Sequence, residues 1–208
     1  MKRIAVFVSG GGTNLQSLID AIEAKEIKSG KIEVVFSNKK DAFGLERAKK
    51  HGIATLHMST KDFQSAEDYD RALARGMNEL NIDLVCLAGY MKILTKAFLD
   101  DFKGHIMNVH PALLPAFGGP GMYGIHVHEA VIEHGVRISG CTVHFVDYGT
   151  DTGPIIVQKA VEVAQEDTPE TLQKKILPFE YAAYKEAVKL YCAGRLEIRG
   201  RRVVISPV

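Results

Sequence analysis

The sequence predicts an α/β protein, a three-layer sandwich with a mostly parallel central sheet and a Rossmann-like N-terminal half. Two observations support this fold class. Short apolar runs alternate with segments of helical hydrophobic spacing through the first half of the chain, which is the pattern of successive βαβ units. The first apolar run also passes through a glycine-rich turn directly into a helix, as in folds that bind a phosphate at that helix.

The first half alternates strands and helices. Arg3 to Val8 is a continuous apolar run, typical of a strand buried on both faces, and Thr13 to Lys25 carries apolar residues at helical spacing. The same patterns predict strands at 31–36, 53–57 and 82–87 and helices at 42–51 and 66–80. Residues 10–14, 88–94 and 108–115 each follow a predicted strand, so we expect them at one edge of the sheet, where parallel sheets bind ligands.

The second half follows a different pattern. A short strand at 105–109 leads into a loop rich in proline and glycine at 111–125 and a short helix at 127–133. Two strands, at 138–146 and 155–163, flank a turn at 147–154. A long helix is predicted from Pro169 to Ala193, with Thr168 as its cap and Gly194 as its stop, and residues 196–205 form a terminal hairpin around Gly200.

Length and composition favour one domain that acts on a small molecule. The 208 residues fit a single domain of two halves, 1–104 and 105–208. The 26 basic and 25 acidic residues nearly cancel, which argues against nucleic acid or a membrane surface as a partner. The three cysteines form no CxxC motif, so we expect reduced thiols in a cytoplasmic protein. The apolar run from Ile4 to Val8 is too short for a signal peptide or a membrane span.

The glycine-rich turn from Ser9 to Asn14 is a candidate anion site. Main-chain N–H groups at a helix N-terminus, together with the helix dipole, favour a bound phosphate. No Gly-Lys-Ser/Thr sequence follows, and Leu15 stands where a dinucleotide fingerprint needs its third glycine. We therefore expect a phosphate monoester rather than a nucleoside triphosphate or NAD. The alternative interpretation is a tight turn without a ligand.

The clearest indication of chemistry is Asn108-Val109-His110-Pro111, followed later by Asp151-Thr152-Gly153-Pro154. Alternate residues of an extended segment point to one side, so the amide of Asn108 and the imidazole of His110 can converge on one atom. A carboxylate at Asp151 would favour the imidazolium and raise the pKa of His110. Together the three groups could stabilise the oxyanion formed when an acyl group moves to an amine. A loop histidine bound to a backbone carbonyl, and an ordinary turn aspartate, are the alternatives.

Other polar residues have weaker patterns. His144, on an alternating strand, is expected to be a hydrogen-bonded structural histidine beside the catalytic groups. His126 and His128 form a pair without a third ligand at suitable spacing, so we expect no metal. Glu180 lies on the long helix next to aromatic residues, a place where most glutamates are simply solvated.

Five segments together resemble a known family. In order they are residues 8–16, residues 37–38 with 42–48, residues 87–91, residues 108–111 and residues 151–154. They resemble the phosphoribosylglycinamide formyltransferases of purine biosynthesis, also called glycinamide ribonucleotide transformylases, within the folate-dependent formyltransferase superfamily. The Asn-x-His-Pro and Asp-x-Gly-Pro sequences mark the superfamily, whereas the glycine loop and the Gly-Leu-Glu-Arg-Ala segment narrow the resemblance to this family.

The resemblance implies a reaction and its participants. A formyl group would pass from 10-formyltetrahydrofolate, the co-substrate, to the glycine amine of glycinamide ribonucleotide, giving formylglycinamide ribonucleotide and tetrahydrofolate without a metal. Residues 1–104 would form a Rossmann-like phosphate-binding half and residues 105–208 a catalytic and folate-binding half. We expect a cytoplasmic monomer or homodimer that binds neither nucleic acid nor membrane.

The resemblance also implies roles for individual residues. For the ribonucleotide they are Gly12, Thr13 and Asn14 at the phosphate and Glu180 at the glycinamide end. For the folate they are Met91, Lys92, Ile93 and Leu94, largely through backbone and apolar contacts, together with Asn108. His110 would be the catalytic acid, with Asn108 beside it and Asp151 as its partner.

Three other functions would use part of this set. A related hydrolase would release formate to water, but such relatives carry an N-terminal regulatory domain that we do not expect here. Methionyl-tRNA formyltransferase needs a C-terminal nucleic-acid-binding extension and a basic surface, which we do not expect in a near-neutral chain of 208 residues. A non-enzymatic sensor of a phosphate ligand would need the glycine loop without the combination of Asn108, His110 and Asp151.

Overall fold

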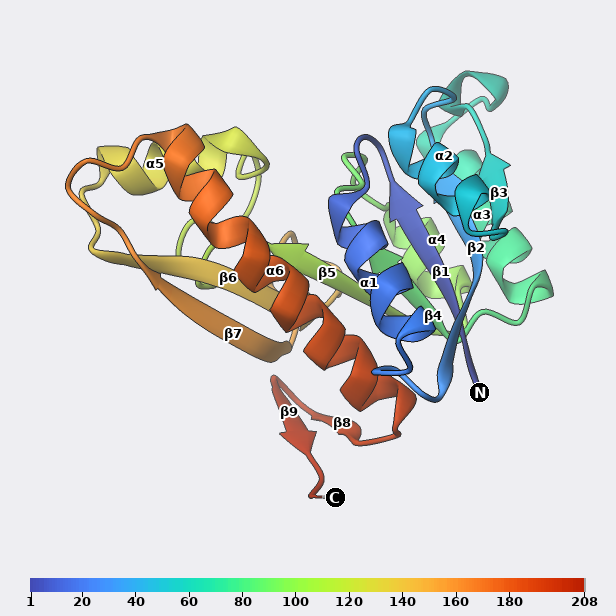
Figure 1. Cartoon of the computed structure of the whole chain (residues 1–208). Coiled ribbons are helices and arrows are strands. Elements are labelled where there is room, and N and C mark those ends of the chain that lie inside the picture. The colour runs from blue at the N-terminus through green and yellow to red at the C-terminus, as the bar shows by residue number, and fades with distance from the viewer. Residues whose placement is uncertain (208) are drawn as a thin grey trace. The chain divides into compact units, whose positions relative to one another are not determined.

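The computed structural model describes residues 1–207, which form two compact units. The first unit is Met1–Met107 and the second begins at Asn108, so the boundary falls inside β5 (His105–His110). Figure 1 labels the elements of both units.

The first unit has the predicted alternation of strands and helices. Its elements are β1 (Lys2–Val8), α1 (Thr13–Glu23), β2 (Gly30–Ser37), α2 (Phe43–Lys50), β3 (Ala54–His57), the 3-10 turn η1 (Thr60–Asp62), α3 (Ala66–Glu79), β4 (Leu84–Leu87), α4 (Lys96–Asp101) and the start of β5. The predicted strands and helices of this unit are confirmed with small differences at their ends. The short helix α4, with 6 residues, was not predicted because it is too short to show a hydrophobic period.

The strands of the first unit lie in the order β3-β2-β1-β4, and these neighbours are parallel. Right-handed crossovers place α1 and α2 on one face of this sheet and α3 on the other, and α1 contacts α2 while α3 contacts α4 (Figure 1). The chain reverses its direction across the sheet between β1 and β4, and ligands bind α/β sheets at such a switch point. The predicted segments 10–14 and 88–94 follow these two strands.

Strand β1 is buried on both faces, which explains its uninterrupted apolar sequence. The five residues from Ile4 to Val8 are all 0% exposed. The Phe7 ring lies at the centre of an aromatic cluster, with centroids of Phe36, Tyr90 and Phe98 at 4.8, 5.4 and 6.0 Å. Burial of each phenylalanine contributes about 1.5–3 kcal/mol to folding. This cluster fixes the strand ends from which the two binding segments emerge.

The second unit is built around antiparallel strands and one long helix. Its elements after β5 are α5 (Ile125–Glu133), β6 (Ile138–Phe145), β7 (Ile155–Glu162), α6 (Pro169–Cys192), β8 (Leu196–Arg199) and β9 (Arg202–Ile205). The strand order is β6-β7-β9-β8, with β6 antiparallel to β7, β7 parallel to β9 and β9 antiparallel to β8. The predicted strands, long helix and terminal hairpin are confirmed, and α5 begins at Ile125, earlier than predicted.

Helix α6 lies across β6 and β7 and covers them with a buried apolar stripe (Figure 1). Its N-terminus has the predicted cap, because the side chain of Thr168 accepts the N–H of Thr171 and the side chain of Thr171 accepts the N–H of Thr168. Gly194, with φ of +69°, follows its end as predicted. Within residues 1–207, no helix is long and apolar enough to span a membrane.

Candidate active site

The glycine-rich turn joins β1 to α1 at the switch point of the first unit's sheet. Gly12 is the N-cap of α1 and has φ of +67°, a left-handed conformation that favours glycine. It offers no side-chain cap, and the first turn of α1 carries no acidic residue. Main-chain N–H groups at Thr13 and Asn14 are therefore in the setting that suits an anion.

Helix α2 holds the carbonyl groups of this turn. The N–H of Gly44 donates to the carbonyl of Gly10 at 3.0 Å, and Nε of Arg47 donates to the carbonyl of Gly11 at 2.8 Å. A Cβ on Gly12 would lie 2.8 Å from Cα of Gly44, so glycine is required for this close approach. No role was predicted for Arg47. Its spacing of three residues from Gly44, which puts both on one helix face, is the signal that could have indicated it.

The segment Met91 to Leu94 follows β4 and is tied to the same turn through Ser9. The N–H of Ser9 donates to the carbonyl of Gly89 at 3.1 Å, and the N–H of Met91 donates to Oγ of Ser9 at 3.0 Å. The side chains of Met91 and Ile93 are exposed, whereas Leu94 is buried. Exposed apolar side chains on a backbone fixed to the sheet are suited to binding a ligand. The structure thus brings together the two predicted binding segments of the first unit.

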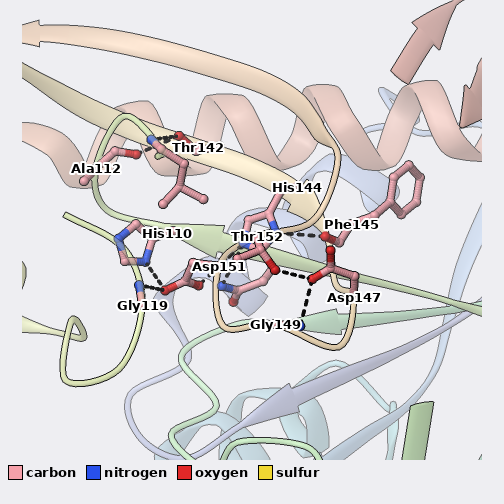
Figure 2. A network of polar contacts seen from close by, with 12 residues as sticks. His110, Ala112, Gly119, Thr142, His144, Phe145, Asp147, Gly149, Asp151 and Thr152 are labelled. Carbon is pink, nitrogen blue, oxygen red and sulfur yellow. Dashed lines mark hydrogen bonds and ion pairs between the residues drawn. The ribbon is translucent and has the colours of Figure 1, made fainter. Parts of the chain in front are cut away.

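The second unit brings together Asn108, His110 and Asp151. Asn108 and His110 lie at the end of β5, and Asp151 lies in the turn between β6 and β7 (Figure 2). Nδ1 of His110 is 3.5 Å from Oδ2 of Asp151, and their side chains are only 4% and 10% exposed. Nε2 of His144 lies 3.7 Å from Oδ1 of Asp151 and 3.4 Å from Nδ2 of Asn108. The four side chains form one polar cluster, in which His110 and His144 are buried.

His144 has a defined orientation in this cluster. Its Nδ1 lies 2.8 Å from the carbonyl of Phe145, and its Nε2 faces both Nδ2 of Asn108 and Oδ1 of Asp151. The sequence placed His144 beside the catalytic groups as a structural residue, and the structure adds direct contacts with both Asn108 and Asp151. These contacts could have been predicted from the position of His144 on a strand, where alternate side chains point to the same side.

The two ring nitrogens of His110 both face oxygen acceptors. Nε2 donates to the carbonyl of Phe117 at 2.7 Å. Nδ1 faces Asp151, whose Oδ2 also accepts the N–H of Gly119 at 3.1 Å (Figure 2). An imidazolium satisfies this arrangement because it has two N–H donors. The alternative interpretation, a histidine bound to a backbone carbonyl, accounts for the contact with Phe117. The second contact of His110 is with the carboxylate of Asp151.

Burial and charge act against each other at His110. Burial lowers the pKa of His110, the charge of Asp151 and the Phe117 carbonyl raise it in part, and nearby His144 lowers it. The pKa of His110 therefore lies below its ordinary value, and Asp151 raises it as expected but by less than burial lowers it. Burial raises the pKa of Asp151, but contacts with His144, His110 and Gly119 outweigh that effect and hold the pKa below its usual range.

The turn after β6 is shaped to present Asp151. Oδ1 of Asp147 accepts the N–H of Gly149 at 3.1 Å and the hydroxyl of Thr152 at 2.5 Å (Figure 2). Asp151 itself has φ of +58°, a left-handed conformation that aspartate tolerates better than most residues. A Cβ on Gly153 would collide with the carbonyl of Phe145, so this position needs glycine. The Asp-x-Gly sequence therefore forms the turn and also positions the carboxylate of Asp151.

The segment after His110 is fixed by Thr142 of β6. The hydroxyl of Thr142 donates to the carbonyl of Ala112 at 2.7 Å and accepts the N–H of Leu114 at 3.0 Å (Figure 2). Nε2 of Gln158 donates to the same hydroxyl and to the carbonyl of Leu114, both at 3.0 Å. These buried bonds hold the chain that leaves the cluster, and sequence reasoning gave neither Thr142 nor Gln158 a role.

The remaining predicted residues lie as follows. Glu180 is 8% exposed on α6, so it is not a solvated surface carboxylate. Burial, followed by the charge of Glu180, raises the pKa of Cys141 to about 12. His126 pairs with Glu129 at 2.9 Å, while His128 is buried. The part of the chain that the structure describes contains no group of three His, Cys, Asp or Glu side chains able to hold a metal ion.

Known proteins match this chain over the region that contains these residues. The family model described as formyl transferase matches residues 2–188. The phosphoribosylglycinamide formyltransferase of Escherichia coli (strain K12) is 40% identical over 195 residues, which cover 94% of this chain and 89% of that protein. The chain belongs to the formyl transferase family, among the phosphoribosylglycinamide formyltransferases.

Other members of this family extend the comparison. Glycinamide ribonucleotide transformylase 1 from Symbiobacterium toebii has a solved structure that shares 46% identity with a TM-score of 0.93, over 100% of this chain and 95% of that chain. This likeness confirms the α/β fold class with a mostly parallel central sheet. The trifunctional purine biosynthetic protein adenosine-3 of Drosophila pseudoobscura pseudoobscura is 45% identical over 196 residues, but the chain spans only 14% of its length.

Proposed function

We infer that this chain transfers the formyl group of 10-formyltetrahydrofolate to the glycine amine of glycinamide ribonucleotide, giving formylglycinamide ribonucleotide and tetrahydrofolate. The observation that carries this inference is the buried cluster in which His110 lies 3.5 Å from Asp151 and His144 lies 3.4 Å from the amide of Asn108. Membership of the phosphoribosylglycinamide formyltransferases gives the cluster its substrates. The reaction is a step of purine biosynthesis.

The chemistry follows from the functional groups. The amine lone pair attacks the formyl carbon, and the carbonyl electron pair moves onto oxygen to form a tetrahedral intermediate. The amide of Asn108 donates to this oxyanion, and so does Nε2 of the His110 imidazolium once the oxyanion takes the place of the Phe117 carbonyl that Nε2 contacts here. Both donate more strongly to the oxyanion than to the neutral carbonyl, which lowers the barrier. The bond to N10 of the folate then breaks as the carbonyl re-forms. One proton leaves the amine and one reaches N10, so the transfer is balanced without a metal.

His110 is the group that can carry this proton, and Asp151 stabilises its charged form. Because burial lowers the pKa of His110, the imidazolium is a stronger acid than a histidine in water. Asp151 offsets part of that effect. His144 acts through Asn108, which it orients, and is therefore a positioning residue rather than a catalytic one.

Each substrate is assigned its own set of residues. We assign the ribonucleotide phosphate to the turn at Gly12, Thr13 and Asn14, since this helix N-terminus has no side-chain cap. We assign the folate to the backbone and apolar side chains of 91–94 and to Asn108, and the glycinamide end to Glu180. The segment 91–94 belongs to the first unit, and Asn108 begins the second.

The enzyme is proposed to act in the cytoplasm as a monomer or homodimer. Cys86, Cys141 and Cys192 are buried and none of them forms a disulfide bond, as is usual in a reducing compartment. Light scattering of the purified protein would distinguish the two assembly states.

The test follows conversion of 10-formyltetrahydrofolate to tetrahydrofolate by absorbance, with and without glycinamide ribonucleotide, while formate is assayed in parallel. Turnover that requires the ribonucleotide and releases no formate is the expected result. Formate release without the ribonucleotide would instead indicate a hydrolase. Equilibrium binding of the ribonucleotide without turnover in either assay would indicate a sensor and would refute the transferase.

A further inference from the structure

A fully buried carboxylate contacts Lys92 within the segment that we assign to the folate and Thr95 directly after it. Asp70 lies on α3 and is 0% exposed. Its Oδ1 accepts from Nζ of Lys92 at 2.8 Å, and its Oδ2 accepts the main-chain N–H of Thr95 at 2.5 Å. One side chain therefore fixes the first and last residues of the stretch from Lys92 to Thr95.

The Lys92 side chain is fixed along its length as well. Nζ also donates to the carbonyl of Ile93 at 3.3 Å and lies 4.9 Å from the centroid of the Tyr69 ring. Only 17% of the side chain is exposed. A lysine that was needed only for solubility or for a long-range charge would extend into water. Lys92 instead contacts Asp70, the carbonyl of Ile93 and the ring of Tyr69.

Stability alone does not explain the buried pair of Asp70 and Lys92. Taking both charges out of water costs as much as, or more than, their attraction returns, and apolar replacements of similar size are often neutral or stabilising. A buried ion pair does give one fixed geometry. The gain here is a defined path for residues 92–95, which have no helix or strand of their own before α4.

The other end of the segment is fixed by the sheet. The N–H of Met91 donates to Oγ of Ser9 at 3.0 Å, and Ser9 in turn donates to Oδ1 of Asn38 at 2.8 Å. Between these two anchors, the side chains of Met91 and Ile93 remain 51% and 69% exposed. An irregular segment with exposed apolar side chains would be mobile if it had no anchors. Here its backbone is held in place while its apolar surface is kept available to a ligand.

We propose that Asp70 is a positioning residue for the folate co-substrate, which it serves by holding the Met91–Leu94 segment in its binding conformation through Lys92 and Thr95. This proposal rests on the proposed function. A preformed segment binds without the further loss of conformational freedom that ordering it would require. Loss of the anchor should therefore weaken folate binding by about 10-fold and leave the ribonucleotide site unaffected.

The test compares steady-state constants for both substrates in variants of the pair. Asp70→Asn keeps the shape and removes the charge. The double variant Asp70→Leu with Lys92→Met removes both anchors and leaves no unpaired charge, so it should fold even if the single variant does not. In both, KM for 10-formyltetrahydrofolate should rise about 10-fold, with KM for the ribonucleotide within about 2-fold of wild type.

Asp83 provides a matched control. It also accepts from a lysine, Lys2, at 3.0 Å and from a main-chain N–H, that of Arg3, at 2.8 Å, but it precedes β4 at the amino end of the strands. Asp83→Asn should lower the thermal midpoint without changing KM for the folate. Direct titration with tetrahydrofolate should give the same ranking of variants as KM.

Two results would overturn the proposal. The first is an unchanged KM for the folate in the folded double variant. The second is an equal rise in both KM values, as a general loss of structure would produce. Absence of folate-dependent turnover in the wild-type protein would instead refute the proposed function, so the two failures are distinguishable.

Discussion

Replacing Asp151 with asparagine should weaken catalysis in a way that depends on pH. The substitution keeps the shape of the side chain and removes the charge that faces Nδ1 of His110 at 3.5 Å. Burial already lowers the pKa of His110, and Asp151 is the main influence that raises it. In the variant the pKa should therefore fall further, and the imidazolium should be lost at a lower pH.

The size of the effect can be worked from the geometry. Two opposite unit charges at the 3.5 Å separation of this pair attract by about 5 kcal/mol at an effective dielectric constant of ~20 and by about 1 kcal/mol in bulk water. Both side chains are at least nine-tenths buried, so the attraction lies well above the value for water. We expect a loss of kcat on the order of 100-fold at neutral pH, because ~2.7 kcal/mol of barrier corresponds to that factor.

The assay is the formyl transfer rate across the pH range, with circular dichroism to confirm folding. Activity requires protonated His110 and so falls as pH rises through its pKa. In Asp151→Asn this fall should be displaced to lower pH, and the deficit should shrink in acid. Asp83→Asn should leave the profile unchanged. A variant with wild-type pH dependence, whatever its rate, would refute the pairing of Asp151 with His110.

Three further outcomes follow from the structure. Asn108→Ala should lower kcat by about 100- to 1,000-fold through loss of one oxyanion donor, and a mild effect in the transfer assay would contradict that role. Ser9→Ala should raise KM for both substrates by roughly 5-fold, since one hydrogen bond of about 1 kcal/mol ties Met91 to the start of the glycine turn; a change in only one KM would argue against a shared anchor. Burial, together with the charge of His110, lowers the pKa of His128 to about 4, below its value in the unfolded chain. The native state therefore loses stability as the pH falls from about 6.5 to 4, and this histidine causes no loss of stability above pH 6.5. His128→Leu should remove about 3 kcal/mol of this acid sensitivity, measured by urea unfolding at both pH values, and an unchanged difference between them would be inconsistent with a buried neutral histidine.

The sequence predicted most of the elements and three candidate catalytic residues that the structure places together. β1 is recognisable because a strand buried on both faces must be apolar throughout, and α6 because Thr168 and Gly194 mark its two ends. Helix α4 was missed because 6 residues are fewer than two helical turns. Asn108 and His110 were accessible to prediction because a strand relates them by a fixed spacing of two.

The net shift of the His110 pKa could not be predicted from the sequence in this way. The direction in which Asp151 acts follows from its charge alone, but the opposing contribution depends on how much water the fold removes from the imidazole. That quantity depends on how the folded chain packs around the ring, so no local pattern reports it. The same holds for the ion pair between Asp70 and Lys92, whose partners are 22 positions apart.

Three aspartates with the same local chemistry show where function enters. Asp70, Asp83 and Asp151 each accept a main-chain N–H and each lie beside a basic side chain. Asp83 does so at the amino ends of the strands, Asp70 next to the segment that follows β4, and Asp151 next to His110 at the end of β5. Because the contacts are alike, their contributions to stability should be similar in kind. Their effects on the reaction should differ, since only Asp70 and Asp151 support groups that we assign to the substrates. Comparison of the three asparagine variants therefore separates the effect of losing such a contact from the effect of where in the fold the contact lies.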